Sequence, residues 1–304
     1  RDILQEAMQS QPQTEVIAHL PREEKIQIPS RHLGLVTDRD LKSDEQRINS
    51  LAQWIGENLS LDILIKRFKL EEDYLPETNP NPGKSLDPTN AFNGDIKKIR
   101  IAVAQDEAFC FYYPDNLNFL EELGAQIICF SPLRDLDLPE NISGMYLGGG
   151  YPELSAQRLA ANSRLKSQIL DFAKNGLPVY AECGGFMYLM QELTDIDDNK
   201  YPMVGLFTLG AQMESKFKAL GYREVCIEQD CILGPANTIC RGHEFHYSSI
   251  QKDAFQGDFL YEVTDRKGRR KSSEGYACRN VLASYIHLHW GSNPKIPRHF
   301  LSFA

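Results

Sequence analysis

The chain has 304 residues, of which 42% are hydrophobic and 25% are charged, and its formal net charge of -9 gives a pI near 5.4. This acidic balance argues against non-specific binding to nucleic acid or to an anionic membrane, and no apolar run approaches the length of a bilayer span. The seven cysteines follow no framework spacing, which predicts free thiols and a cytoplasmic location.

Residues 1–98 are predicted to hold no complete domain. Residues 16–20 form a short apolar run typical of a strand, and residues 43–68 carry apolar residues at helical spacing. These few elements could not close a sheet, so residues 1–70 are expected to be the end of a domain that starts outside the sequence. Residues 71–98 are rich in Pro, Asn, Gly and Asp, and this composition predicts an interdomain linker.

A second domain is expected over residues 99–304, where strands and helices alternate. Alternation predicts a mainly parallel, doubly wound α/β sheet with functional residues at the carboxyl ends of its strands. Beyond residue 200 the alternation weakens, and the shorter strands there are expected to be partly antiparallel. Strands are predicted at residues 99–104, 125–130, 144–147, 179–182, 204–207, 222–227, 261–263, 274–278 and 281–291, and helices at 114–123, 155–175 and 186–190.

Cys183 lies at a predicted strand-to-helix turn and is followed by two glycines. A nucleophile elbow places its reactive side chain at such a turn, because small neighbours permit a strained backbone and let a carbonyl approach. The Gly184 amide could donate to an oxyanion, and the N-terminus of the following helix would favour a thiolate. The competing interpretation is a buried structural cysteine.

A thiol nucleophile needs a base, and the predicted strand at 281–291 carries His287 and His289 on one face. One of them could reach Cys183 while the other orients it; the alternative is a pair of structural histidines. Gly149 and Gly150, which follow another strand, are expected to help form an oxyanion hole with Gly184.

Residues 240–248 concentrate polar and aromatic side chains in a short segment. Arginine and histidine suit carboxylates, and aromatic rings suit a flat organic molecule, so this segment is expected to line a substrate pocket. A metal site built on Cys240 and the histidines is the less favoured interpretation, because the spacing matches no zinc pattern, and no metal is expected in this chain. The substrate-binding candidates are Arg241, His243, Glu244, His246 and Tyr247.

Five segments together resemble the cobyrinic acid a,c-diamide synthase family of class I glutamine amidotransferases. The resemblance implies a three-layer α/β sandwich with a mainly parallel sheet, preceded by the tail of a P-loop, dethiobiotin-synthetase-like domain. The segments are residues 28–35 (IPSRHLGL), 146–154 (YLGGGYPEL), 181–189 (AECGGFMYL), 241–248 (RGHEFHYS) and 283–290 (ASYIHLHW).

The resemblance also implies roles for individual residues. Cys183 matches the glutaminase nucleophile and His287 matches its base. The class I pattern usually has a glutamate two residues after this histidine, and His289 stands there instead, which leaves the orienting group open. The implied substrates are glutamine, whose amide would be released as ammonia, and cobyrinic acid or a related corrinoid.

ATP and Mg²⁺ are the cofactors that the resemblance implies, and they would activate corrinoid acetate groups as acyl phosphates. The sequence contains no G-x-x-x-x-G-K-[ST], so this chain is expected to supply only the glutaminase part of the enzyme. The sequence does not decide whether the chain forms a homodimer.

Four alternatives remain at this stage. Cobyric acid synthase and nickel-sirohydrochlorin a,c-diamide synthase would use related tetrapyrroles, and a plain cysteine hydrolase would lack ammonia transfer. A non-catalytic tetrapyrrole-binding module would use neither Cys183 nor His287.

Overall fold

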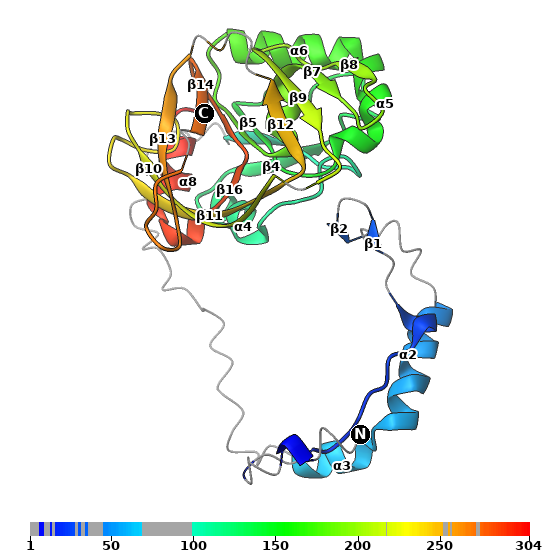
Figure 1. The fold of residues 1–304 in the computed structure, drawn as a ribbon. Coiled ribbons are helices and arrows are strands. Elements are labelled where there is room, and N and C mark those ends of the chain that lie inside the picture. Colours follow the sequence, from blue (N-terminus) through cyan, green and yellow to red (C-terminus); the bar gives the residue numbers. More distant parts are fainter. Residues whose placement is uncertain are drawn as a thin grey trace. The chain divides into compact units, whose positions relative to one another are not determined.

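The computed structural model describes residues 6–8, 13, 16–27, 30–31, 34–35, 45–68, 99–216, 218–251, 255, 257–271 and 274–304. The chain divides into two compact units, Arg1–Asn90 and Ala91–Ala304 (Figure 1). The predicted linker at residues 71–98 lies outside the described residues. Among the helices in the described ranges, none is both long enough and apolar enough to cross a lipid bilayer.

The described part of the first unit is mostly helical. The helices predicted within residues 43–68 are confirmed, but residues 16–20 are not a strand, and Val16, Ile17 and Leu20 are exposed. Without a neighbouring strand, an apolar run has no partner for its backbone hydrogen bonds. The elements are η1 (Glu24–Ile26), β1 (Ser30–Arg31), β2 (Gly34–Leu35), α2 (Glu45–Asn58) and α3 (Leu61–Arg67), and β1 and β2 form an antiparallel pair.

A ten-stranded mixed sheet forms the centre of the second unit, in the order β16-β11-β10-β13-β14-β15-β6-β5-β3-β4 (Figure 1). Its strands are β3 (Arg100–Ala104), β4 (Gln126–Phe130), β5 (Gly144–Leu147), β6 (Val179–Glu182), β10 (Ala219–Ile227), β11 (Ile239–His246), β13 (Phe259–Asp265), β14 (Glu274–Cys278), β15 (Val281–Ser284) and β16 (Ile286–His289).

The expectation of a mainly parallel sheet is correct for one half of this sheet only. From β15 to β4 every neighbouring pair is parallel, whereas from β16 to β15 every pair is antiparallel. The connections explain the difference, because parallel neighbours need a crossover of about a dozen residues or more. β14 and β15 are joined by only Arg279 and Asn280, and such a tight turn can join only antiparallel strands.

A second, four-stranded sheet has the order β12-β9-β7-β8. Its strands are β7 (Met190–Thr194), β8 (Lys200–Pro202), β9 (Phe207–Met213) and β12 (Ser248–Gln251). The strand predicted at residues 204–207 therefore begins only at Phe207.

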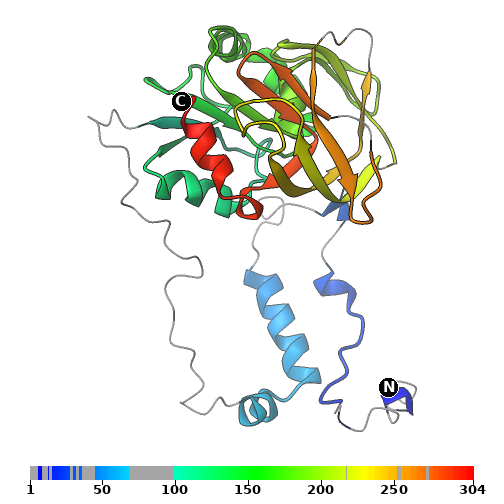
Figure 2. The ribbon, with the colours of Figure 1, turned by 90° about the vertical axis from the view of Figure 1, so that its left-hand side faces the viewer.

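Helices pack on both faces of the central sheet, and α7 also contacts β7 and β9 of the second sheet, which confirms the layered α/β sandwich. Helices α4 (Pro114–Glu122) and α8 (Lys295–Leu301) lie side by side (Figure 2) and contribute Leu120 and Phe300 to a core with Tyr146 and Trp290. On the other face, α7 (Gly184–Leu189) contacts β5, β6 and β15. β3, β5 and β6 are buried along almost their whole length because both of their faces are covered.

Two predicted elements are interrupted. The helix expected at residues 155–175 consists of η4 (Pro152–Ser155), α5 (Ala156–Ala161) and α6 (Ser163–Lys174). Asn162 separates the last two, because its side chain caps α6 and also donates to two loop carbonyls. The strand expected at residues 281–291 breaks at Tyr285, where the chain leaves β15 and enters β16, which is followed by η5 (Trp290–Ser292).

Candidate active site

Cys183 lies where β6 ends and α7 begins. Its φ of 46° and ψ of -103° are strained for a non-glycine residue, at a cost on the order of 1–3 kcal/mol. The Cys183 amide donates to the Ser284 carbonyl (2.8 Å), and the Met187 amide donates to the Cys183 carbonyl (2.9 Å). A Cβ on Gly185 would lie 2.1 Å from the Leu147 carbonyl oxygen, so a glycine is required there. The predicted strand-to-helix turn is confirmed.

The thiol of Cys183 is buried and 7% of the residue is exposed. Burial, and after it the charge of Glu153, raise the pKa of this thiol to about 12, while a hydrogen bond from the Gly184 amide acts in the opposite direction. α7 has only 6 residues, so its dipole does not offset the burial. The resting side chain is therefore a neutral thiol at pH 7, and the effect expected of the helix N-terminus does not outweigh the effect of burial.

The turn formed by Gly149 and Gly150 contacts both His287 and Gly184, the residue after Cys183. A Cβ on Gly149 would lie 2.2 Å from His287 Cε1, so the turn packs directly on the imidazole. A Cβ on Gly184 would lie 3.0 Å from the Gly150 amide nitrogen, which places that nitrogen next to the residue that follows the nucleophile. The Gly149 amide already donates to the Phe111 carbonyl (3.1 Å), so the oxyanion role predicted for all three glycines is left to Gly150 and Gly184.

His287 is buried in β16 and packs against this turn. Its ring stacks on the ring of His243 across the β11–β16 pair, with ring centroids 4.7 Å apart and planes inclined by 6°. Burial, followed by the neighbouring His243 and His246, lowers the pKa of His287 to about 3. The imidazole is therefore neutral at pH 7 and free to accept a proton, as a general base must be.

A buried carboxylate that the sequence prediction missed lies beside His287. Glu182 is the last residue of β6, it is 0% exposed, and its Oε2 is 3.8 Å from His287 Nδ1. The sequence does contain a signal for Glu182. It is an ionisable residue inside an otherwise apolar strand, directly before the candidate nucleophile.

His289, the orienting group considered from the sequence, is turned toward α4. Its Nε2 lies 3.1 Å from Asp115 Oδ2, and its ring meets the ring of Tyr113 edge to face at 4.8 Å. Its side chain is 37% exposed, whereas that of His287 is 8% exposed.

The side chains of the polar segment at residues 240–248 alternate between the two faces of the sheet, because residues 239–246 form strand β11. Arg241 is exposed and pairs with Glu224 (2.9 Å), away from the site. His243 faces His287, and the Phe245 carbonyl oxygen lies 3.9 Å from Cys183 Sγ. Of the substrate-binding candidates, the structure therefore brings His243 to the site and leaves Arg241 outside it.

Glu244 and His246 line a separate cavity of ≈ 580 Å³ beside the site. Glu244 bridges Arg223 (2.7 Å) and His246 (2.9 Å), and the other ring nitrogen of His246 faces the Ser248 carbonyl (2.8 Å). Both ring nitrogens of His246 thus lie within hydrogen-bond distance of an oxygen. Tyr247 packs edge-on against Phe245 at 5.6 Å.

The less favoured metal interpretation finds no support in the described ranges, which contain no group of three or more His, Cys, Asp or Glu side chains arranged to hold an ion. Cys240 contacts the Ser292 hydroxyl (3.2 Å), and His243 Nδ1 contacts the Tyr113 hydroxyl (2.6 Å). All seven cysteines are free, as predicted.

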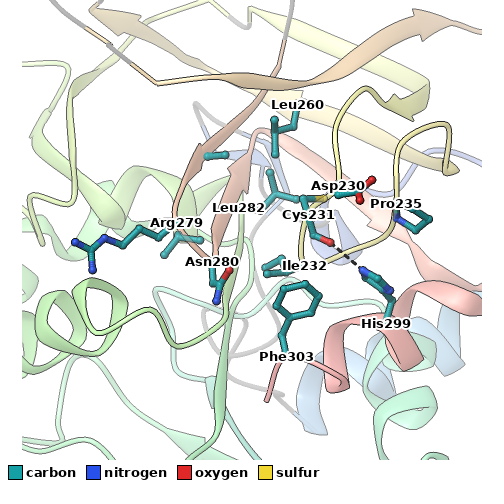
Figure 3. A pocket seen from close by; sticks show the side chains of 12 residues that line it. Asp230, Cys231, Ile232, Pro235, Leu260, Arg279, Asn280, Leu282, His299 and Phe303 are labelled. Atoms are coloured by element: carbon teal, nitrogen blue, oxygen red, sulfur yellow. Dashed lines mark hydrogen bonds between the residues drawn. The ribbon is translucent and has the colours of Figure 1, made fainter.

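A cavity of ≈ 350 Å³ lies away from this site (Figure 3). Val281, the first residue of β15, lines it, whereas Ser284 at the other end of β15 contacts Cys183. His299 donates from Nε2 to the Cys231 carbonyl (3.0 Å) on its wall. This cavity is therefore at the amino end of β15 and is separate from Cys183.

Residues 100–295 match the family of CobB/CobQ-like glutamine amidotransferase domains. Relatives called cobyrinate a,c-diamide synthase include proteins from Dehalococcoides mccartyi (38% identical over 301 residues, covering 99% of this chain and 64% of that protein) and Limosilactobacillus reuteri (37% over 290 residues, covering 94% and 61%). The chain thus spans less than two thirds of the length of these relatives.

Among solved structures, PurLQS from Thermotoga maritima is similar with a TM-score of 0.47 and 16% identity, covering 68% of this chain and 99% of that one. The domain match covers more than half of the chain and includes Cys183, His287 and the glycine turn. The chain therefore belongs to the family of CobB/CobQ-like glutamine amidotransferase domains.

Proposed function

We propose that this chain supplies the glutaminase part of an ATP-dependent enzyme that amidates the a and c acetate groups of cobyrinic acid in cobalamin biosynthesis. One observation carries the proposal: the Gly149–Gly150 turn contacts His287 on one side and the residue after Cys183 on the other. This contact supports a site in which Cys183 as nucleophile, His287 as neutral base and amide donors face one carboxamide, as acyl transfer requires.

In the first half of the reaction, His287 accepts the proton of the Cys183 thiol and the sulfur attacks the side-chain carboxamide of glutamine. The amides of Gly150 and Gly184 stabilise the oxyanion that forms on the carboxamide oxygen. The imidazolium of His287 then protonates the departing nitrogen. The carbon–nitrogen bond breaks, and ammonia and a glutamyl thioester on Cys183 result.

In the second half, water replaces ammonia as the partner of His287. The imidazole removes a proton from water, the resulting hydroxide attacks the thioester, and the carbon–sulfur bond breaks. Glutamate leaves, and the proton returns to the sulfur of Cys183. The products of the whole cycle are ammonia and glutamate.

The described residues of this chain give no support for a site that binds ATP and Mg²⁺. The sequence has no P-loop pattern, and the described residues form no carboxylate cluster arranged for a metal ion. We therefore assign the binding of both to a segment outside these 304 residues, in line with the greater length of the relatives, and derive no step through them here.

The choice of cobyrinic acid rests on the relatives, which are called cobyrinate a,c-diamide synthases at 36–38% identity. Cobyric acid synthase and nickel-sirohydrochlorin a,c-diamide synthase share the chemistry of the glutaminase site. Chromatography of the amidated product from each of the three tetrapyrrole acids separates these assignments.

The test compares the intact protein with its Cys183→Ala variant, using cobyrinic acid and either glutamine or ammonium chloride. The variant is expected to lose glutamine-dependent diamide and to keep ammonia-dependent diamide, because only release of ammonia needs the thiol. Cys278→Ala, a substitution of a cysteine in β14, serves as the matched control and should change neither activity. Glutamine-dependent amidation that persists in Cys183→Ala would overturn the proposal.

A further inference from the structure

Glu182 is held in place by three hydrogen bonds. Its Oε1 accepts from the Tyr180 hydroxyl (2.5 Å) and from the Leu288 amide (2.9 Å), and its Oε2 accepts from the Tyr146 hydroxyl (2.9 Å). Oε2 also faces His287 Nδ1 at 3.8 Å. A fully buried carboxylate destabilises the fold unless it is paired or hydrogen-bonded. The presence of Glu182 at this position therefore indicates a role beyond packing.

We propose that Glu182 is the positioning residue of the glutaminase site, in the role that class I enzymes give to a glutamate two residues after the histidine. This inference rests on the proposed function. The bond to the Leu288 amide fixes the strand next to His287, and Oε2 sets the orientation of the ring. The same residue that leads into the nucleophile turn thus aligns the base.

The carboxylate favours one tautomer of His287. A proton on Nδ1 faces the negative oxygen, which leaves the lone pair on Nε2 as the acceptor for the Cys183 proton. When His287 takes that proton, the imidazolium gains an anionic partner 3.8 Å away, with the proton remaining on the ring. Shortening of this distance to a hydrogen bond would accompany the step.

Other candidates for this role have different partners. His289 lies against Asp115, and Glu244 is shared between Arg223 and His246. Among the described contacts, the one carboxylate paired with the His287 ring is therefore Glu182.

Burial raises the pKa of Glu182 to about 7, against the opposing effects of the bonds from Tyr180, Leu288 and Tyr146. Around this carboxylate, burial raises the pKa of the tyrosines and cysteines and lowers that of the histidines. They are Tyr112, Tyr113, Tyr146, Tyr180, Tyr261, Cys183, Cys240, His243 and His287.

The protonation of Glu182 determines how kcat/KM for glutamine hydrolysis changes with pH. Below pH 7 the carboxyl group is protonated and offers no charge to the imidazolium, so kcat/KM for glutamine hydrolysis should be low. It should rise as pH increases through about 7, because the anion that supports His287 then forms.

The test measures kcat/KM for glutamine against pH in the intact protein, with Glu182→Gln and Glu182→Asp. Glu182→Gln is expected to lose about 100-fold or more at pH 8 and to lose the rise near pH 7, because its amide carries no charge. Glu182→Asp should recover part of the rate together with a rise. Ammonia-dependent amidation serves as the control for folding.

Tyr180→Phe provides a second test of the role of Glu182, and this test remains informative if Glu182→Gln does not fold. The Tyr180 hydroxyl lowers the pKa of Glu182, so its removal should move the rise to higher pH. A wild-type rate and pH profile in Glu182→Gln, or an unmoved rise in Tyr180→Phe, would overturn this inference while leaving the proposed function intact. Glutamine hydrolysis by Cys183→Ala would instead overturn the proposed function.

Discussion

Cys183 and His287 are both neutral in the resting site, because burial disfavours the charged form of each. In the proposed reaction, the thiolate of Cys183 is therefore generated by proton transfer to His287 and is not present in the resting site. Such a thiol is protected from unwanted alkylation and oxidation, which act on the thiolate.

This resting state predicts the pH dependence of alkylation by iodoacetamide. The rate at Cys183 should rise about tenfold per pH unit between about pH 7 and pH 10 without levelling off, because the thiol pKa is about 12. Peptide mapping by mass spectrometry separates Cys183 from the other cysteines, and urea-unfolded protein is the control, where the rate should level off above about pH 9. A plateau for the folded protein by about pH 8 would show a resting thiolate.

At the same scale, the sequence pointed to the candidate nucleophile Cys183 and the candidate base His287, but not to Glu182, the carboxylate beside His287. Cys183 is marked by its two glycines and its place at the end of an apolar run. The carboxylate of Glu182 is held by Leu288, 106 positions away, and by Tyr146, 36 positions away. Contacts at such separations are fixed by the fold and leave no local pattern.

At the scale of elements, the glycine turn after β5 contacts both His287 and Gly184, the residue after Cys183. Gly149→Ala would place a methyl group 2.2 Å from the His287 ring, so the ring must move. A displacement of about 1 Å is expected to lower glutamine turnover about 100-fold with little change in ammonia-dependent amidation.

Gly210→Ala in β9 is the matched control. A Cβ there would meet its nearest neighbour, Gln251 Oε1, at 3.5 Å, which is ordinary contact distance. Both variants are assayed for glutamate release at saturating glutamine. Wild-type turnover in Gly149→Ala would contradict the packing of the turn on His287.

The parallel half of the sheet was predictable because strands buried on both faces appear as short apolar runs between turns. The sequence did not predict strand β11, because polar residues stand on both of its faces and hide any alternation of apolar and polar residues. These polar residues are Arg241, His243, Glu244 and His246. The breaks at Asn162 and Tyr285 depend on loop carbonyls and on neighbouring strands, which a local pattern does not specify.

At the scale of the whole molecule, residues 99–304 contain a hydrophobic core and all the residues that we propose for the glutaminase site. The α/β class and the sandwich were predicted from alternation and from the family resemblance. The role expected for residues 1–70, as the end of a synthetase domain, and the linker at 71–98 stay predictions.

The central claim is that glutamine hydrolysis passes through a glutamyl thioester on Cys183. The most direct measurement is acid quenching of the intact protein during steady-state turnover of glutamine, followed by peptide mass mapping. We predict a glutamyl adduct on the Cys183 peptide that disappears when glutamine is exhausted. Sustained release of glutamate with no adduct on Cys183, together with undiminished release by Cys183→Ala, would contradict the account.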